Sequence, residues 1–252
     1  MRVPLPPAFL TTPLAHRGLH NRANGIIENS ASAIRAAVAA GYGIEVDLQL
    51  SLDGVPMVFH DETLDRLTAE HGWVNTRTAA ELAQITLTDS ADIIPTLDHI
   101  LTLIAGRVPL LIELKDQSLI MADTDGRLEA ATAAVLATYA GPVALMSFNP
   151  HSITHLAALA PDLPRGLTTG GFDPIDWHPM PPAQCAALRE IADYDRTLSS
   201  FISHEAADLS RPRVSTLRAQ GATILCWTIR SVGIEAEARK IAQNITFEGY
   251  AA

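Results

Sequence analysis

Residues 41–61 read GYGIEVDLQLSLDGVPMVFHD, and this stretch decides the fold. Residues 44–50 alternate apolar side chains with polar ones, which predicts a β-strand. Successive side chains on a strand point to opposite faces, so Glu45 and Asp47, two positions apart, share one face. The strand therefore has one acidic face and one apolar face, and the apolar face is expected to pack in the core.

A tight turn is expected directly after this strand. Asp53-Gly54 is a strong signal for a two-residue hairpin loop, and residues 55–59 then return along the strand. The hairpin brings His60 back toward the end of the strand that carries the two carboxylates. Hard oxygen ligands and a side chain that titrates near neutral pH are thus expected to meet in one place.

Strand-like and helix-like segments alternate along the chain. Strands are expected at residues 13–18, 44–50, 109–114, 143–148, 165–169, 198–204, 222–229 and 244–247, with 55–59 as an extra strand. Helices are expected at residues 31–41, 78–84, 95–105, 130–139, 150–160, 183–192, 212–219 and 232–242. Such alternation is typical of an α/β fold with a parallel sheet. Eight units in 252 residues fit a (β/α)8 barrel, the TIM barrel.

The barrel is expected to carry a small insertion after the hairpin of the second strand. Residues 62–95 are irregular apart from the weak helix at 78–84, and no linker divides the chain. Residues 1–252 are therefore predicted to form one domain that includes this insertion. The alternative is an open doubly wound sheet, which is disfavoured because no glycine-rich GxGxxG loop follows the first strand.

Composition argues against several functional classes. The 18 Lys and Arg residues against 28 Asp and Glu give a net charge of −10, which disfavours a nucleic-acid-binding protein. No long apolar run is present, so neither a membrane span nor a stable membrane anchor is expected. The N-terminus lacks the pattern of a signal peptide. Two cysteines alone, Cys185 and Cys226, indicate reduced thiols and a cytoplasmic location.

In a TIM barrel the active site lies at the carboxyl ends of the strands. The side chains at the predicted strand ends are polar or aromatic: His16, Arg17, Glu45, Asp47, His60, Glu113, Lys115, Phe148, Asn149, His204, Glu205 and Trp227. Three of them are carboxylates that suit one divalent cation, Mg²⁺ or Ca²⁺, namely Glu45, Asp47 and Glu113. The predicted rim thus holds a candidate metal site.

Two further pairs complete a candidate catalytic site. His16 and His60 suit an acid/base pair, and Arg17 and Lys115 suit the binding of a phosphate group. Together with a metal, these are the parts needed for metal-assisted cleavage of a phosphoester.

Each of these residues alone also has an ordinary structural explanation. His16 beside Arg17 can cap a turn, and Glu113 with Lys115 can form a surface ion pair of small energetic value. The joint placement of so many such residues at strand ends favours a site. His204 is ambiguous, because it ends a strand on the same rim, and a structural role is favoured for it.

Several motifs resemble those of the glycerophosphodiester phosphodiesterases of the cytoplasmic bacterial type. The similar segments are AHRG at 15–18, EN at 28–29, EVDLQLSLDGVPMVFHDETLDRLT at 45–68, IELK at 112–115, SFNP at 147–150 and WTI at 227–229. The similarity runs from residue 15 to about residue 230, and the segment 45–68 is its most specific part.

The resemblance implies a TIM-barrel enzyme that converts small-molecule glycerophosphodiesters to glycerol 3-phosphate and an alcohol. It also implies roles for nine residues: acid/base catalysis by His16 and His60, phosphate binding by Arg17 and Lys115, contact with the glycerol or alcohol by Phe148 and Trp227, and binding of one divalent cation, Mg²⁺ or Ca²⁺, by Glu45, Asp47 and Glu113. The attacking group is either water or the substrate's own neighbouring hydroxyl.

Some positions depart from the family pattern. Ile27 replaces a common proline, Ser30 a common threonine, Arg230 a common asparagine, and residues 247–249 a usual Thr-Asp pair. These positions are expected to lie away from the metal and histidine positions and to affect substrate choice more than the reaction. Arg230 either adds a charge to the alcohol side of the pocket or is a solvated residue at a helix start.

Two alternatives stand beside a glycerophosphodiesterase. A related barrel phosphodiesterase of lysophospholipase D or phosphoinositide type would use the same catalytic groups with another head group. A non-catalytic phosphodiester-binding barrel would be expected to lack one of the two histidines or three carboxylates, and all five are present.

Overall fold

The computed structural model describes residues 1–252 and shows a closed barrel of eight parallel strands. In order around the ring these strands are β1 (Leu14–Ala15), β2 (Gly43–Leu50), β4 (Leu110–Leu114), β5 (Val143–Ser147), β6 (Arg165–Thr169), β7 (Phe201–Glu205), β8 (Thr223–Ile229) and β9 (Asn244–Phe247). The ring closes because β1 pairs in parallel with both β2 and β9. The predicted TIM barrel is therefore confirmed.

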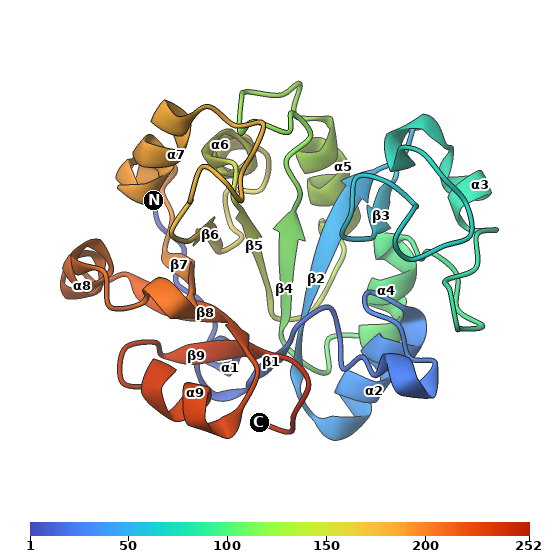
Figure 1. Cartoon of the computed structure of the whole chain (residues 1–252), viewed down its shortest axis with the longest axis horizontal. Helices are drawn as coiled ribbons and strands as arrows, with labels where there is room; N and C mark the ends of the chain where they lie inside the picture. Colours follow the sequence, from blue (N-terminus) through green and yellow to red (C-terminus); the bar gives the residue numbers. More distant parts are fainter.

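Most of the helices cover the outside of the barrel (Figure 1), whereas α1 (Ala8–Thr11) packs against one end of it through Phe9 and α3 (Ala79–Leu82) belongs to the insertion. The other helices are α2 (Ala31–Ala40), α4 (Leu97–Ile104), α5 (Arg127–Leu136), α6 (Pro150–Leu159), α7 (Pro182–Arg189), α8 (Pro212–Ala219) and α9 (Val232–Ala238), with single 3₁₀ turns at Arg22–Asn24, Val74–Thr76, Ala192–Tyr194 and Ala206–Asp208. Local sequence sets the ends of α2. The side chain of Ser30 accepts a hydrogen bond from the Ala33 amide, and Gly41 closes the helix in the left-handed conformation.

Two strands begin or end several residues away from their predicted bounds. The first was expected at residues 13–18 but ends at Ala15, because Arg17 adopts a left-handed backbone conformation (φ 55°) that leaves the sheet. The seventh was expected from residue 198 but begins at Phe201, because Leu198 is also left-handed (φ 54°). In both places the backbone turns where side-chain pattern alone indicates a continuous strand.

The predicted hairpin after β2 is present. The short strand β3 (Pro56–Val58) runs antiparallel to β2, and the Ser51 amide donates a hydrogen bond to the Val55 carbonyl at 3.0 Å. Gly54 takes a left-handed conformation (φ 83°) in the turn, which glycine adopts without steric cost. The hairpin returns the chain to His60 beside the end of β2.

The two faces of β2 contact different parts of the core. Ile44, Val46 and Leu48 are fully buried in the main hydrophobic cluster, which joins the barrel to helices such as α2 and α4. The opposite face points into the barrel. There a separate apolar cluster fills the lower end: Leu5, Phe9, Leu14, Leu111, Ala144, Met146, Phe201 and Leu225. The inner wall is thus apolar below and acidic above, at the carboxyl ends of the strands.

Residues 62–95 lie between β3 and α4, and they form loops around the short helix α3 on the side of the barrel near β3 (Figure 1). This segment has a small hydrophobic cluster of its own, which includes Leu64, Val74 and Leu82 and rests on Phe59 at the end of the hairpin. The division of the chain into one domain with an insertion stays a prediction.

The helices of the structure are all too short or too polar to cross a lipid bilayer.

We predict that barrel packing tolerates no side chain at Gly166 in β6. A Cβ atom there would lie 2.5 Å from the Phe201 ring and 2.6 Å from the Phe201 backbone oxygen. Gly166→Ala should therefore lower the free energy of unfolding by about 1–3 kcal/mol through overpacking. Urea unfolding monitored by circular dichroism measures this change.

Gly233→Ala is the matched control. Gly233 lies in α9, and a Cβ atom there would meet nothing within 4 Å. Alanine should leave the free energy of unfolding unchanged or raise it by about 0.5–1 kcal/mol, because glycine is the poorer helix former. Equal effects of the two substitutions would contradict the packing argument.

Candidate active site

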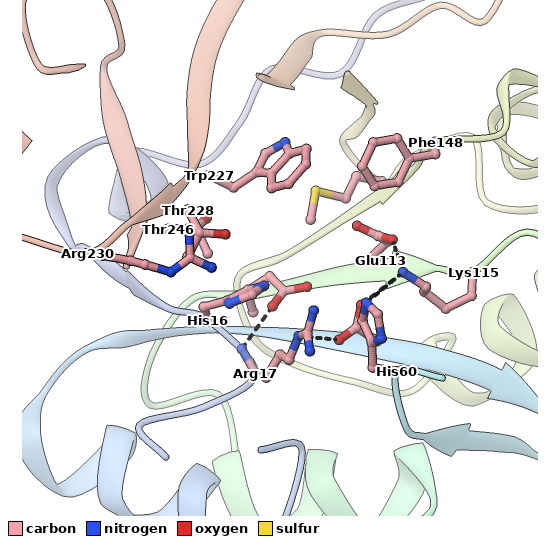
Figure 2. Close-up of a pocket in the computed structure, with 13 residues that line it drawn as sticks. His16, Arg17, His60, Glu113, Lys115, Phe148, Trp227, Thr228, Arg230 and Thr246 are labelled. Atoms are coloured by element: carbon pink, nitrogen blue, oxygen red, sulfur yellow. Dashed lines mark hydrogen bonds and ion pairs between the residues drawn. The ribbon is translucent and has the colours of Figure 1, made fainter. Parts of the chain in front are cut away.

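A cavity of about 140 Å³ opens at the carboxyl ends of the strands. All nine residues proposed from the sequence line it: His16, Arg17, Glu45, Asp47, His60, Glu113, Lys115, Phe148 and Trp227. Three residues that the sequence analysis did not assign to a site, Met146, Thr228 and Thr246, also line the cavity. Arg230 completes the wall, and a place in the pocket was one of the two expectations for it. Figure 2 shows His16 and His60 on opposite sides of this cavity.

Three buried carboxylates form the floor of the site. Glu45 and Asp47 alternate with apolar residues on β2, and the parallel register places Asp47 directly beside Glu113 on β4. One oxygen from each carboxylate lies within 4.8 Å of the others, and each residue is at most 5% exposed. Burial, and then the charges of Asp47 and Glu113, raise the pKa of Glu45 well above its usual value.

The loop after β1 and the start of α2 hold two of these carboxylates in place. The backbone amide of Arg17 donates to Glu45 Oε2 at 2.9 Å. Asn29 Nδ2 donates to Asp47 Oδ2 at 2.9 Å, and Asn29 Oδ1 accepts from the Asp47 amide at 3.3 Å. Both Arg17 and Asn29 have positive φ, which non-glycine residues adopt only where the surroundings enforce it. The sequence analysis treated Asn29 only as part of a motif and missed this contact.

Two cations lie against the carboxylates. Arg17 donates to Glu28 at 2.6 Å, and its Nε lies 3.4 Å from Asp47. Lys115 Nζ donates to Glu113 at 2.9 Å and lies 3.6 Å from Asp47. Although burial opposes the change, the carboxylates of Glu113 and Asp47 raise the pKa of Lys115, so its ammonium group is charged.

The three carboxylates fit a divalent cation. They are hard oxygen donors, which Mg²⁺ and Ca²⁺ prefer. Burial, and then the charges of Asp47 and Glu113, raise the pKa of Glu45 although Arg17 lies close to it. A divalent cation among them would favour the ionised form of all three, so Glu45, Asp47 and Glu113 form a candidate metal site.

Each histidine that lines the cavity is paired with a carboxylate through Nδ1. His16 Nδ1 lies 2.5 Å from Glu248 Oε2, and His60 Nδ1 lies 2.7 Å from Asp61 Oδ1. Ionised carboxylates only accept hydrogen bonds, so Nδ1 carries the proton and Nε2 is the acceptor in each neutral ring. His60 Nε2 accepts from Lys115 Nζ at 3.2 Å. Burial lowers the pKa of His16, which favours its neutral form.

The contact of His16 with Glu248 corrects one expectation. Residues 230 and 247–249 were expected to lie away from the histidines, and this is wrong, because Glu248 binds His16 and also accepts from Arg230 Nε at 2.7 Å. The cause is barrel closure. Ala15 on β1 is paired with Phe247 on β9, so the next residues of the two strands, His16 and Glu248, lie side by side.

Aromatic rings form the opposite wall of the cavity. Phe148 and Trp227 pack edge to face with their ring centroids 5.4 Å apart, and Phe148 also contacts Trp177 at 4.9 Å. Beyond them a larger groove of about 520 Å³ begins at His60 and reaches Trp73 and Trp177. The sequence analysis assigned neither Trp73 nor Trp177 to a site, because both lie in irregular segments far from any predicted strand end.

His204 lies outside the cavity wall. It is fully buried, its Nδ1 lies 2.8 Å from Thr169 Oγ1, and its Nε2 lies 3.3 Å from Asp208. These contacts tie β7 to β6 and to the 3₁₀ turn that follows β7. This arrangement agrees with the structural role favoured for His204.

Comparison with known proteins gives consistent matches. The model of the glycerophosphoryl diester phosphodiesterase family matches residues 16–246. A glycerophosphodiester phosphodiesterase of Caldanaerobacter subterraneus is 32% identical over 178 residues, which cover 67% of this chain and 70% of that protein. The similarity therefore extends through most of the barrel.

Solved structures share the fold. A phosphodiesterase of Oleispira antarctica, in complex with its product sn-glycerol-3-phosphate, has a TM-score of 0.77 at 24% identity and covers 96% of this chain and 94% of that chain. A glycerophosphodiester phosphodiesterase of Agrobacterium tumefaciens has a TM-score of 0.68 at 26% identity, with coverage of 94% and 96%. Both support the barrel architecture described above.

We predict that Glu28 makes stability depend on pH in the acid range. Although burial opposes the change, hydrogen bonds from Arg66 and the charge of Arg17 lower the pKa of Glu28 from 4.5 to about 2. A lowered pKa in the folded state stabilises the fold above the unfolded pKa, and this contribution disappears as pH falls from 4.5 toward 2. Glu28→Gln should therefore cost about 2 kcal/mol near pH 7 and much less near pH 3.

Urea unfolding of both proteins at a series of pH values measures the difference. Glu237→Gln is the control, because Glu237 is 73% exposed and pairs only with Lys240. Its effect should be small at every pH. A cost of Glu28→Gln that does not change between pH 7 and pH 3 would show that the ionised carboxylate is not the stabilising species.

Proposed function

The chain belongs to the glycerophosphoryl diester phosphodiesterase family, and we propose that it hydrolyses glycerophosphodiesters to glycerol 3-phosphate and an alcohol. One observation carries the proposal: three buried carboxylates and two histidines line one small cavity, with the histidines on opposite sides of it (Figure 2). Phosphodiester hydrolysis needs charge stabilisation at the phosphate and proton transfer at both the attacking and the leaving oxygen.

The proposed metal is one divalent cation, Mg²⁺ or Ca²⁺, held by Glu45, Asp47 and Glu113. When bound, it supplies a Lewis acid that polarises the phosphate oxygens. Arg17 and Lys115 bind and orient the phosphate beside these carboxylates. The Arg17 side chain already pairs with Glu28 and the Lys115 side chain with Glu113. These two ion pairs hold both side chains in position before substrate binds.

We assign His16 as the general base. Its lowered pKa keeps the ring neutral, and the Glu248 carboxylate leaves Nε2 as the acceptor atom. His16 Nε2 takes the proton from the attacking hydroxyl as the new bond from oxygen to phosphorus forms. The attacker is water or the neighbouring hydroxyl of the glycerol; the second route passes through a cyclic phosphate.

We assign His60 as the general acid. The groove toward Trp73 and Trp177 begins at His60, so it offers space for the alcohol on that side. For this step the 3.2 Å contact from Lys115 Nζ to His60 Nε2 must break, and Nε2 must take up a proton. The resulting imidazolium gives that Nε2 proton to the leaving alkoxide as the bond from phosphorus to oxygen breaks. Asp61 stabilises that charged ring through Nδ1.

Phe148 and Trp227 provide the apolar wall that faces the phosphate site. Both rings line the cavity, and the indole Nε1 of Trp227 donates to the Ser203 carbonyl at 3.0 Å, which fixes its orientation. We propose that these rings contact the carbon skeleton of the glycerol. Rigid aromatic walls with few polar groups are typical of small-molecule sites.

A phosphodiesterase that acts on another head group is the second candidate, because the groove of about 520 Å³ can hold an alcohol larger than ethanolamine. A non-catalytic barrel is disfavoured, since each of the five catalytic and metal-binding side chains lines the cavity.

The buried free thiols of Cys185 and Cys226 support a cytoplasmic location. We further propose that residues 1–252 form a single domain and that the substrate is a small molecule.

We predict release of glycerol 3-phosphate from glycerophosphocholine and glycerophosphoethanolamine in the presence of Mg²⁺ or Ca²⁺ but not in EDTA. The same ions should raise the melting temperature, because binding to the folded state alone stabilises it. Metal-induced stabilisation without turnover of either substrate would move the proposal to another head group. Turnover in EDTA at the full rate would exclude the metal role.

We predict that His16→Ala and His60→Ala each lower kcat by about 10²–10⁴-fold, the range expected for loss of a general acid or base. Circular dichroism and the metal-induced melting shift should remain as in the original protein. His71→Ala is the control, because His71 is 80% exposed and pairs with Asp65 in the loops after β3. A fully active His16 or His60 variant would refute the corresponding assignment.

A further inference from the structure

A chain of three side chains leads from His16 to the edge of the cavity. One oxygen of Glu248 lies 2.5 Å from His16 Nδ1, and its other oxygen accepts from Arg230 Nε at 2.7 Å. His20 Nε2 lies 3.6 Å from the Glu248 oxygen that faces His16. The Glu248 side chain is only 20% exposed. Both of its oxygens therefore have a partner, and its orientation is fixed from both ends.

His60 has a similar arrangement. Asp61 holds His60 Nδ1, and Arg66 Nε donates to the other Asp61 oxygen at 2.6 Å. Each histidine of the cavity thus has a carboxylate on Nδ1 and an arginine behind that carboxylate. Such an arrangement fixes both the tautomer and the plane of an imidazole ring. The pair of Glu248 and Arg230 and the pair of Asp61 and Arg66 come from unrelated parts of the chain.

Arg230 differs from the other cations of the cavity. Arg17 and Lys115 are paired with carboxylates through their terminal nitrogens, whereas Arg230 uses only Nε for Glu248. Its side chain is 62% exposed, and it lies on the same side of the pocket as His16 (Figure 2). The terminal nitrogens of Arg230 therefore remain free to meet an anionic group of the substrate.

We propose that Glu248 is the positioning residue of His16 and that Arg230 both holds Glu248 and contacts the substrate. The inference rests on the proposed function of His16. Glu248 accepts a hydrogen bond from the Nδ1–H of His16, so Nε2 carries the lone pair of the ring that faces the cavity. Without this carboxylate the ring can rotate and can exchange its proton between the two nitrogens, and a ring with a protonated Nε2 cannot act as a base there.

Two substitutions separate positioning from simple folding. Glu248→Gln keeps the size of the side chain but removes the charge, and Glu248→Ala removes the contact altogether. We expect Glu248→Ala to lower kcat by about 10²–10⁴-fold, as found when the carboxylate behind a catalytic histidine is lost. The KM of Glu248→Ala should change less than about threefold. The kcat of Glu248→Gln should lie between those of the original protein and Glu248→Ala. Arg230→Gln should lower kcat about tenfold and also raise KM, because it loses a charged contact.

The tautomer of His16 distinguishes positioning from folding, because it would not change if Glu248 served only to stabilise the fold. Nitrogen NMR of the ¹⁵N-labelled imidazole ring, assigned with His16→Gln, should show the proton on Nδ1 in the original protein. In Glu248→Ala the signal should shift toward the Nε2-protonated form or toward a mixture. This measurement needs neither metal nor turnover, so it tests the positioning even if no glycerophosphodiester is hydrolysed.

The outcomes are distinct. Loss of kcat together with the change of tautomer, in a protein with an unchanged melting temperature, supports the proposal. Unchanged kcat in Glu248→Ala, or an unchanged His16 tautomer, overturns it. Absence of turnover in the original protein counts against the proposed function and leaves the NMR result to decide the role of Glu248. Glu237→Gln on α9 is the matched control and should change none of these quantities, because Glu237 is 73% exposed.

Discussion

The burial of three carboxylates on the inner wall of the barrel is the constraint on which the rest of the site depends. Glu45, Asp47 and Glu113 place one oxygen each within 4.8 Å of the others, and each residue is at most 5% exposed. Like charges at this separation are unfavourable in a low-dielectric interior. The surrounding chain offsets them with Arg17 and Lys115, and the three carboxylates together form the candidate site for a divalent cation.

This constraint also explains the irregular backbone between β1 and α2. Arg17 and Asn29 occupy the left-handed region, which is costly for side chains that carry a Cβ. In return, the Arg17 amide and the Asn29 side chain bind Glu45 and Asp47. The short length of β1 has the same origin, since the chain leaves the sheet after Ala15 in order to reach the carboxylates.

Charged contacts continue outward from the carboxylates through segments that lie far apart in sequence. Glu28 joins Arg17 to Arg66, and Arg66 in turn holds Asp61 behind His60. On the other side, Glu248 holds His16 from a distance of 232 residues along the chain. Each histidine thus has a carboxylate on Nδ1, one supplied locally by the hairpin and one supplied by closure of the barrel.

The sequence by itself determined the barrel, the hairpin after β2 and nine of the residues that line the cavity, because these depend on local periodicity and on which side chains end each strand. The bounds of β6, α8 and β9 agree with the segments expected from the sequence. Only the tertiary structure decided that Glu248 contacts His16 and Arg230 contacts Glu248, that Asn29 binds Asp47, and that Trp73 and Trp177 line the groove. Those contacts depend on the register with which β1 joins β9 and on the paths of long loops. Both are set by packing between segments distant in sequence, and no local pattern encodes them.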